Sequence, residues 1–292
     1  LESVSQQRLA RQADDAQAVL GLAMVALQAD DAGRRDAALQ RARACIRQRP
    51  QAAECQYALG VVLGVHALSQ GMVKAATSIG TVKDALLQAL EAAPQWYPAR
   101  SAVVEFYLTV PALMGGGAGR AREVAHAAPR SEQVKAFDGR IALADDRPEA
   151  ALALLQAVPT AGDAALEEDV AGWTAQAAFA LLARGQAAAA RPVFERLQRA
   201  QPGQALPAYG LGRVHTDLGA PAEAVRWLEQ AARLTGAAVL PIDYRLGLAL
   251  QADGRTEPAR AALARHVAAG KGPAKALDDA KKRLAQLGGP PD

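Results

Sequence analysis

The sequence predicts an all-α protein built from repeated helix pairs, for three reasons. First, its 292 residues exceed the usual size of one compact core, yet no linker divides them, and a repeat array can lengthen without enlarging a single core. Second, 51% of the residues are hydrophobic but only 4% are aromatic, because much of the apolar content is alanine, which suits closely packed helices. No stretch alternates apolar and polar residues as a strand does.

The third reason is a repeat of about 34 residues in the C-terminal half. Residues of the same kind recur at an offset of 34: Ala178 and Gly212, Gly185 and Gly219, Ala190 and Ala224, Phe194 and Leu228, and Leu197 and Ala231. The next unit follows at an offset of 35, with Gly247, Gly254, Ala259 and Leu263. Several positions that share one offset indicate a repeated structural unit.

These residues resemble the tetratricopeptide repeat (TPR). Gly212 with His215, followed by Ala224 and Leu228, matches the order G-x-x-Y … A-x-x-x-F of that family. In such a pair the small residues let two helices cross closely, and a closing proline ends the second helix. The resemblance implies an all-α fold, a right-handed TPR superhelix (α-solenoid) of about seven helix pairs with a C-terminal capping helix.

We expect one solenoid over residues 1–292, with an initial helix pair within Ser3–Pro50. Irregular repeats with apolar insertions are expected over 51–129, and regular repeats over 160–272. The polar segment at 273–288 is expected to form the capping helix, because the last repeat of a solenoid needs a polar outer face.

The irregular repeats contain about ten extra residues. Gly60 and Val82 are 22 positions apart, where a regular repeat has about 12, so the excess falls across Gly71–Gly80. A second, smaller excess ends in Val110–Met114. Both are apolar, so they either thicken the core or line a pocket for an apolar ligand such as a lipid. The residues that would line this pocket are Val61, Val65, Leu68, Met72, Ile79, Phe106, Tyr107, Leu113 and Met114.

A second resemblance concerns the same irregular repeats. Val82–Leu90, then Glu105–Leu108, Pro111 and Gly115-Gly116, look like irregular bacterial periplasmic TPR proteins. These include the lipoproteins that accompany TRAP-type transporters. The resemblance implies a bacterial, periplasmic or envelope-associated location, a role in transport, and an apolar small-molecule cargo.

Two cysteines bear on the compartment. Cys45 lies late in the helix that ends at Pro50, and Cys55 lies early in the next helix, so both flank one turn. They either form a disulfide, which requires an oxidising compartment, or fill helix contacts as two small buried residues. The chain opens at Leu1 rather than at methionine, which predicts that an N-terminal segment was removed or left out. The longest apolar run, Tyr57–Leu68, is too short to span a membrane, so we expect a soluble mature chain.

The concave side of the predicted superhelix is the second candidate binding surface. The residues expected to face it are Tyr57, Glu105, Tyr209, Arg213 and Tyr244. A protein partner or peptide would lie along this groove. The chain contains no asparagine, so we do not expect the TPR mode that grips a C-terminal carboxylate with paired Asn and Lys.

Charge and motif content argue against other classes of function. The formal net charge is +3, and acidic residues interrupt the basic clusters at Arg34–Arg49 and Lys281–Arg283, so no nucleic-acid partner is expected. These clusters are either solvated helix faces or contacts to an anionic partner or membrane surface. Four scattered histidines and two cysteines do not form a metal site, and no nucleophile or phosphate-binding motif is complete. We therefore expect no enzyme, no metal and no cofactor.

The sequence thus predicts a non-enzymatic TPR scaffold that mediates protein–protein interaction in the bacterial envelope. The alternative is a periplasmic carrier that binds an apolar small molecule or lipid in the irregular repeats.

Overall fold

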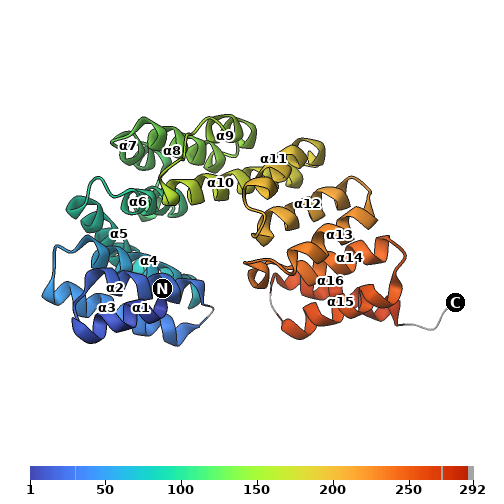
Figure 1. Ribbon diagram of the computed structural model, residues 1–292, viewed down its shortest axis with the longest axis horizontal. Coiled ribbons are helices and arrows are strands. Elements are labelled where there is room, and N and C mark those ends of the chain that lie inside the picture. Colours follow the sequence, from blue (N-terminus) through green and yellow to red (C-terminus); the bar gives the residue numbers. More distant parts are fainter. Residues whose placement is uncertain (30, 271, 289–292) are drawn as a thin grey trace. The chain divides into compact units, whose positions relative to one another are not determined.

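The computed structural model describes residues 1–29, 31–270 and 272–288 of the chain, and these residues form an all-α structure (Figure 1). In the described residues, α1 is followed by seven consecutive helix pairs, from α2 to α15, and then by α16. This arrangement confirms the predicted fold class. The helices are α1 (Glu2–Arg11), α2 (Ala16–Gln28), α3 (Ala32–Gln48), α4 (Ala53–Ser69), α5 (Met72–Ala92), α6 (Tyr97–Thr109), α7 (Ala118–His126), α8 (Ser131–Ala144), α9 (Pro148–Leu155), α10 (Ala164–Ala183), α11 (Ala187–Ala200), α12 (Ala205–Asp217), α13 (Pro221–Ala231), α14 (Ile242–Ala252), α15 (Thr256–Ala269) and α16 (Ala274–Leu287), with short 3-10 turns η1 (Ala112–Met114) and η2 (Ala237–Val239).

The chain divides into two compact units. The first comprises residues 1–144 and 158–167, and the second comprises residues 145–157 and 168–292, so the boundary falls within α10. In each unit, consecutive helices pack side by side along the chain, from α1 to α8 in the first and from α11 to α16 in the second (Figure 1). No linker marks this division in the sequence, so it was not predicted. The handedness of the predicted superhelix stays a prediction.

Glycines bring the two helices of a pair into close contact. A Cβ atom on Gly212 in α12 would lie 2.6 Å from Leu228 Cγ in α13, and a Cβ on Gly247 in α14 would lie 2.6 Å from Leu263 Cγ in α15. In both pairs the leucine follows its glycine by sixteen positions. The repeat found in the sequence therefore corresponds to one recurring contact between helices.

The same contact in the first unit locates the extra residues. A Cβ on Gly60 in α4 would lie 2.6 Å from Leu86 Cδ2 in α5, but here the leucine follows by 26 positions, ten more than in the regular pairs. α4 runs nine residues past Gly60, whereas α12 runs five past Gly212. The insertion is thus neither a loop nor a separate layer, because it lengthens both helices of the pair.

Turn glycines mark the regular pairs of the second unit. Gly185, Gly219 and Gly254 stand between the two helices of successive pairs, with φ of 74°, 71° and 76°. This left-handed conformation is costly for residues that carry a Cβ, so glycine is favoured at each position. The recurring glycine is therefore a requirement of the turn.

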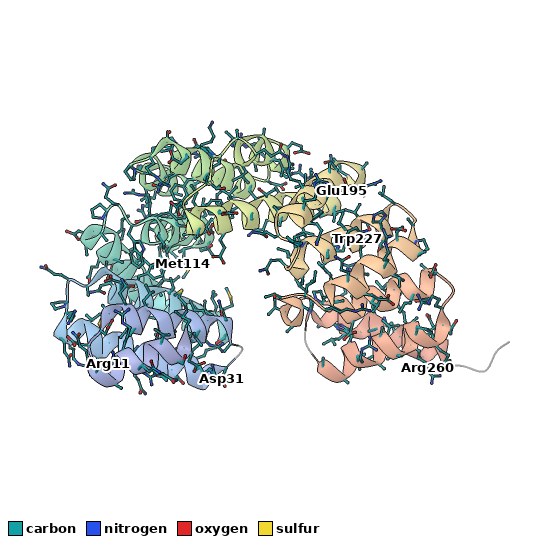
Figure 2. All side chains as sticks on the ribbon, in the orientation of Figure 1. Arg11, Asp31, Met114, Glu195, Trp227 and Arg260 are labelled. Atoms are coloured by element: carbon teal, nitrogen blue, oxygen red, sulfur yellow. A yellow bond between two sulfur atoms is a disulfide. The ribbon has the colours of Figure 1, made fainter. Side chains whose placement is uncertain are left out.

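Side chains fill the spaces between adjacent helices within each unit (Figure 2). Phe137 in the first unit and Phe194 in the second are fully buried and are the largest such side chains. Phe194 packs against Phe179, with ring centroids 4.8 Å apart. Alanine is the most frequent of the buried residues, so the helices pack closely in a chain with few aromatics.

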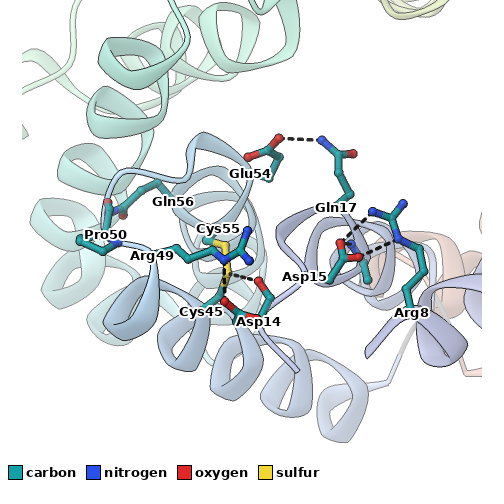
Figure 3. Close-up of a disulfide and its surroundings, with 11 residues drawn as sticks. Arg8, Asp14, Asp15, Gln17, Cys45, Arg49, Pro50, Glu54, Cys55 and Gln56 are labelled. Atoms are coloured by element: carbon teal, nitrogen blue, oxygen red, sulfur yellow. Dashed lines mark hydrogen bonds and ion pairs between the residues drawn. A yellow bond between two sulfur atoms is a disulfide. The ribbon is translucent and has the colours of Figure 1, made fainter. Parts of the chain in front are cut away.

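The two cysteines lie on the helices that flank the first inter-repeat turn. The structure joins Cys45 in α3 to Cys55 in α4 in a disulfide, with Cα atoms 5.9 Å apart (Figure 3). Both residues are buried, at 2% and 0% exposure. Beside them Arg49 Nε donates to Asp14 Oδ2 over 2.5 Å, and this contact to the guanidinium lowers the pKa of the Asp14 carboxyl.

Removal of this disulfide is expected to destabilise the first unit. The double variant Cys45→Ser, Cys55→Ser should lose about 2–3 kcal/mol of unfolding free energy, because the bridge closes a loop of about ten residues in the unfolded chain. Chemical denaturation with and without a reductant measures the effect. The reductant should lower the unfolding free energy of the wild type but not that of the variant. Two free thiols per unfolded wild-type chain would show that the bridge does not form.

Candidate functional site

A cleft of about 360 Å³ lies in the first unit, where the N-terminal ends of α6, α8 and α10 come together. Each of these is the first helix of its pair, so the cleft is built from equivalent positions of three successive repeats. The lining residues are Gln95, Trp96, Tyr97, Pro98, Pro129, Arg130, Gln133, Asp163 and Ala165.

Gln133 is the polar group of this cleft that the fold leaves unsatisfied. It lies in the first turn of α8 and is 3% exposed. Its side-chain oxygen is buried and has no hydrogen-bond partner among the described residues. A buried amide oxygen without a hydrogen bond costs free energy, so such a group at the edge of a cleft points to a ligand that would donate to it.

One wall of the cleft consists of aromatic and proline side chains. Tyr97 is 5% exposed and stacks on Phe137, with ring centroids 5.5 Å apart and planes 11° apart. Trp96 is half-buried against Tyr57, at a centroid distance of 4.9 Å. Pro98 completes this wall, so the cleft offers a rigid apolar surface beside the Gln133 amide.

The charged side chains at the edge of the cleft are paired with one another. Arg130 donates to Asp163 Oδ2 over 2.6 Å and lies 3.1 Å from Glu132 Oε1. Asp163 also accepts from the backbone N–H of Leu166 over 3.1 Å and so caps α10. The Arg130 guanidinium is therefore already engaged by two carboxylates and offers little attraction to an anionic ligand.

Arg100 in α6 connects neighbouring segments of the first unit. Its guanidinium is buried and donates to Val124 O over 2.8 Å and to Pro94 O over 2.9 Å. Burial lowers the pKa of this side chain. Arg100 thus links α6 to α7 and to the turn between α5 and α6.

Sequence reasoning missed this cleft. Trp96, Arg130 and Asp163 each stand just before the first helix of a pair, at offsets of 34 and 33 from one another. This regular spacing could have indicated the cleft. The predicted site residues lie instead in the apolar insertions and within the helices.

Two of the predicted groove residues make contacts between neighbouring repeats. In the first unit Glu105 accepts from Arg140 Nε over 2.5 Å and from Arg140 Nη2 over 2.8 Å. Tyr57 packs against Trp96 and so supports the cleft wall. Glu105 and Tyr57 therefore connect neighbouring repeats within the first unit.

The other three predicted groove residues lie in the second unit. Tyr209 is 5% exposed and therefore belongs to the core. The Arg213 guanidinium lies 5.6 Å from the Phe179 ring, and burial lowers its pKa, with Arg245 nearby adding to the effect. Tyr244 donates to Asp279 Oδ2 over 2.9 Å, and burial followed by this contact raises its pKa. Whether these positions receive a partner stays a prediction.

The residues predicted to line an apolar pocket do not come together around either described cleft. Phe106 and Tyr107 are buried at 8%, whereas Leu68, Met72 and Leu113 are 61%, 82% and 101% exposed. Val65 and Met114 are also exposed, and Val61 and Ile79 are partly buried. A second cleft, of about 210 Å³ between α1, α2 and α3, contains none of the nine. The insertion carries part of its apolar surface to the tip of a helical hairpin. Whether the nine residues line a ligand site stays a prediction.

Other chemical groups are dispersed over the described part of the chain. Within it, no three His, Cys, Asp or Glu side chains are grouped as metal ligands would be. No helix there is both long enough and apolar enough to cross a bilayer. Partial burial and the nearby Arg191 lower the pKa of His215, which takes the aromatic position of its repeat.

No protein-family profile and no curated protein sequence matches this chain. Solved structures do. A chain of the APC/C hetero-tetramer Cut9–Hcn1 aligns with a TM-score of 0.55 at 14% identity over 97% of this chain and 52% of that one, so the chain spans about half its length. A tetratricopeptide repeat protein from Parabacteroides merdae ATCC 43184 aligns with a TM-score of 0.51 at 13% identity, over 93% and 99% of the two chains.

PilW, a type IV pilus biogenesis factor, aligns with a TM-score of 0.53 at 15% identity, over 78% of this chain and 97% of that one. At these identities a structural likeness establishes the fold alone. Together with the recurring glycine–leucine contact, it shows that the chain has the helix-pair repeat fold of TPR proteins.

Proposed function

We propose that this protein is a non-enzymatic scaffold that binds an extended segment of a partner protein in the cleft at the N-terminal ends of α6, α8 and α10. The observation that carries the proposal is the side-chain oxygen of Gln133, which is buried at the edge of that cleft and has no hydrogen-bond partner among the described residues. This oxygen can accept a hydrogen bond from a backbone N–H group of an extended segment.

The apolar wall sets the side chain that such a segment would present. Trp96, Pro98 and Pro129 offer flat, rigid surfaces that lose little conformational entropy on binding. An aliphatic side chain or a proline next to the recognised peptide group would pack against them. The balanced Arg130–Asp163 pair contributes no strong charge preference.

The disulfide supports a location in an oxidising compartment. A bridge between Cys45 and Cys55 persists in the bacterial envelope but is rare in the reducing cytosol. We therefore propose that the scaffold works in the envelope. The carrier hypothesis has less support, because the residues expected to enclose an apolar ligand leave Leu68, Met72 and Leu113 exposed.

A Gln133→Leu substitution tests the proposal. Peptides selected from a phage-displayed library of extended decamers serve as the probe, and fluorescence polarisation measures their affinity. The variant should bind about tenfold more weakly, because the loss of one hydrogen bond to a buried amide oxygen is equivalent to about 1.4 kcal/mol. Its thermal stability should be unchanged or higher, because an unsatisfied buried polar group is replaced by an apolar one.

Gln198→Leu is the matched control. The side-chain oxygen of Gln198 is also buried and has no partner in the part of the chain that the structure describes, but it lies on α11 in the second unit. The Gln198→Leu substitution should leave the peptide affinity unchanged. Equal affinities of wild type and Gln133→Leu would contradict the assignment of the cleft.

A further inference from the structure

The tip of the α4–α5 hairpin exposes an unusual amount of apolar surface. Of the residues at 68–77, all but the partly buried Ala75 are exposed. Leu68 is 61% exposed, and Met72 and Val73 are both 82% exposed. α5 begins 14 residues before Leu86, whereas α13 begins seven before Leu228, so the added turns carry α5 about 10 Å further than in a regular pair.

The first turns of α5 are amphipathic. Met72, Ala75, Ala76 and Ile79 are spaced i, i+3, i+4 and i+7 and share one face with Val73, whereas Lys74, Thr77 and Ser78 lie on the other side. A helix with an apolar face and a lysine on its polar face can lie in a membrane interface, with the apolar face at the boundary between headgroups and acyl chains.

The polar groups near the tip are largely satisfied within the hairpin. Thr77 Oγ1 and Ser78 Oγ donate to Lys74 O over 3.0 and 2.9 Å, and Ser69 Oγ donates to His66 O over 2.7 Å. These hydroxyl groups can therefore leave bulk water without losing their hydrogen bonds, which reduces the cost of desolvating the tip.

The charge of the hairpin complements an anionic surface. No acidic residue occurs between Glu54 and Asp84, while Lys74 lies at the tip and is exposed. No side chain caps the N-terminus of α5 at Gly71, so the positive end of that helix also faces outward. Lower on the hairpin, His66 faces Asp36 of α3 at 3.4 Å, and this acid belongs to the neighbouring helix.

We propose that this tip, residues 68–77, inserts into the headgroup region of an anionic lipid membrane. Leu68, Met72 and Val73 enter the boundary between headgroups and acyl chains, and Lys74 and the open end of α5 contact lipid phosphates. The hairpin thus holds the protein at a membrane surface. The peptide cleft is lined by other helices, so this inference does not depend on the proposed function.

Vesicle sedimentation tests the proposal directly. The full chain is mixed with vesicles of phosphatidylethanolamine and phosphatidylglycerol in a 3:1 ratio, or with phosphatidylcholine alone. We expect binding to the anionic vesicles that falls as salt is raised, because exposed charges are screened. Val73→Asp should reduce the partition coefficient at least about tenfold. It replaces an apolar side chain that would enter the membrane with a charge of the same sign as the lipid.

Val239→Asp is the matched control, because Val239 is 81% exposed and lies on η2 in the second unit. It should bind as the wild type does, and circular dichroism should show both variants fully helical. Lys74→Glu should remove the preference for anionic vesicles. The proposal is overturned if the wild type does not sediment with anionic vesicles, if Val73→Asp binds like the wild type, or if both Asp variants lose binding equally.

Discussion

Replacing Gly210 with alanine is expected to lower the free energy of unfolding by about 2–3 kcal/mol. A Cβ at this position would lie 2.3 Å from Phe194 Cδ1 and 2.3 Å from Cε1. The Phe194 ring is fully buried and packs against Phe179 at 4.8 Å, so it has no space into which to retreat. The greater helix propensity of alanine offsets only about 1 kcal/mol of this strain.

Gly172→Ala is the matched control for this prediction. Gly172 lies within α10, in the same compact unit, and nothing stands within 4 Å of its would-be Cβ. The same substitution should therefore stabilise the chain by about 0.5–1 kcal/mol. Urea denaturation followed by circular dichroism measures both variants. If both substitutions changed the free energy of unfolding equally, close packing between α11 and α12 could not explain the presence of glycine at position 210.

Phe137→Ala is expected to cost about 3–5 kcal/mol, the largest effect that we predict for a single side chain. Phe137 is fully buried in the first unit and supports Tyr97, a lining residue of the cleft, through their stacked rings. Its removal leaves a cavity behind the cleft wall, so Tyr97 loses its support and peptide affinity should fall together with stability.

Phe137→Leu separates the two effects. Leucine keeps an apolar side chain in the core and should cost less than alanine, while it still removes the ring on which Tyr97 stacks. The unfolding midpoint in urea and the peptide affinity are measured for both variants. An alanine variant as stable as the wild type would contradict the packing of the first unit.

The fold could be predicted from sequence because it depends on contacts that recur at a fixed spacing. Gly212 and Gly247 each lie against a leucine sixteen positions later, so their offset in the sequence reflects one geometry. The same contact at Gly60 shows why the length of the insertion could also be counted. Its form could not, because ten apolar residues fit a loop, a thicker core or two longer helices equally well.

The cleft could not be predicted in the same way. It is assembled from the ends of three helices, and Trp96, Gln133 and Asp163 become neighbours only when those helices stack. Among the described residues the side-chain oxygen of Gln133 has no hydrogen-bond partner, and this depends on how the helices pack. It cannot be read from the sequence. The cysteines differ, because helices joined by a short turn are neighbours in any helical repeat, so the pairing of Cys45 with Cys55 could be anticipated.

Site-directed photo-crosslinking tests the central claim most directly, namely that the cleft binds a partner protein. A benzoylphenylalanine residue is placed at Pro98 in the cleft and, as a control, at Arg191 on α11 in the second unit, and cells of the native host are irradiated. We predict one discrete protein adduct from position 98 that disappears in the Gln133→Leu background, and none from position 191. No adduct at position 98, or the same adduct from both positions, would contradict the account.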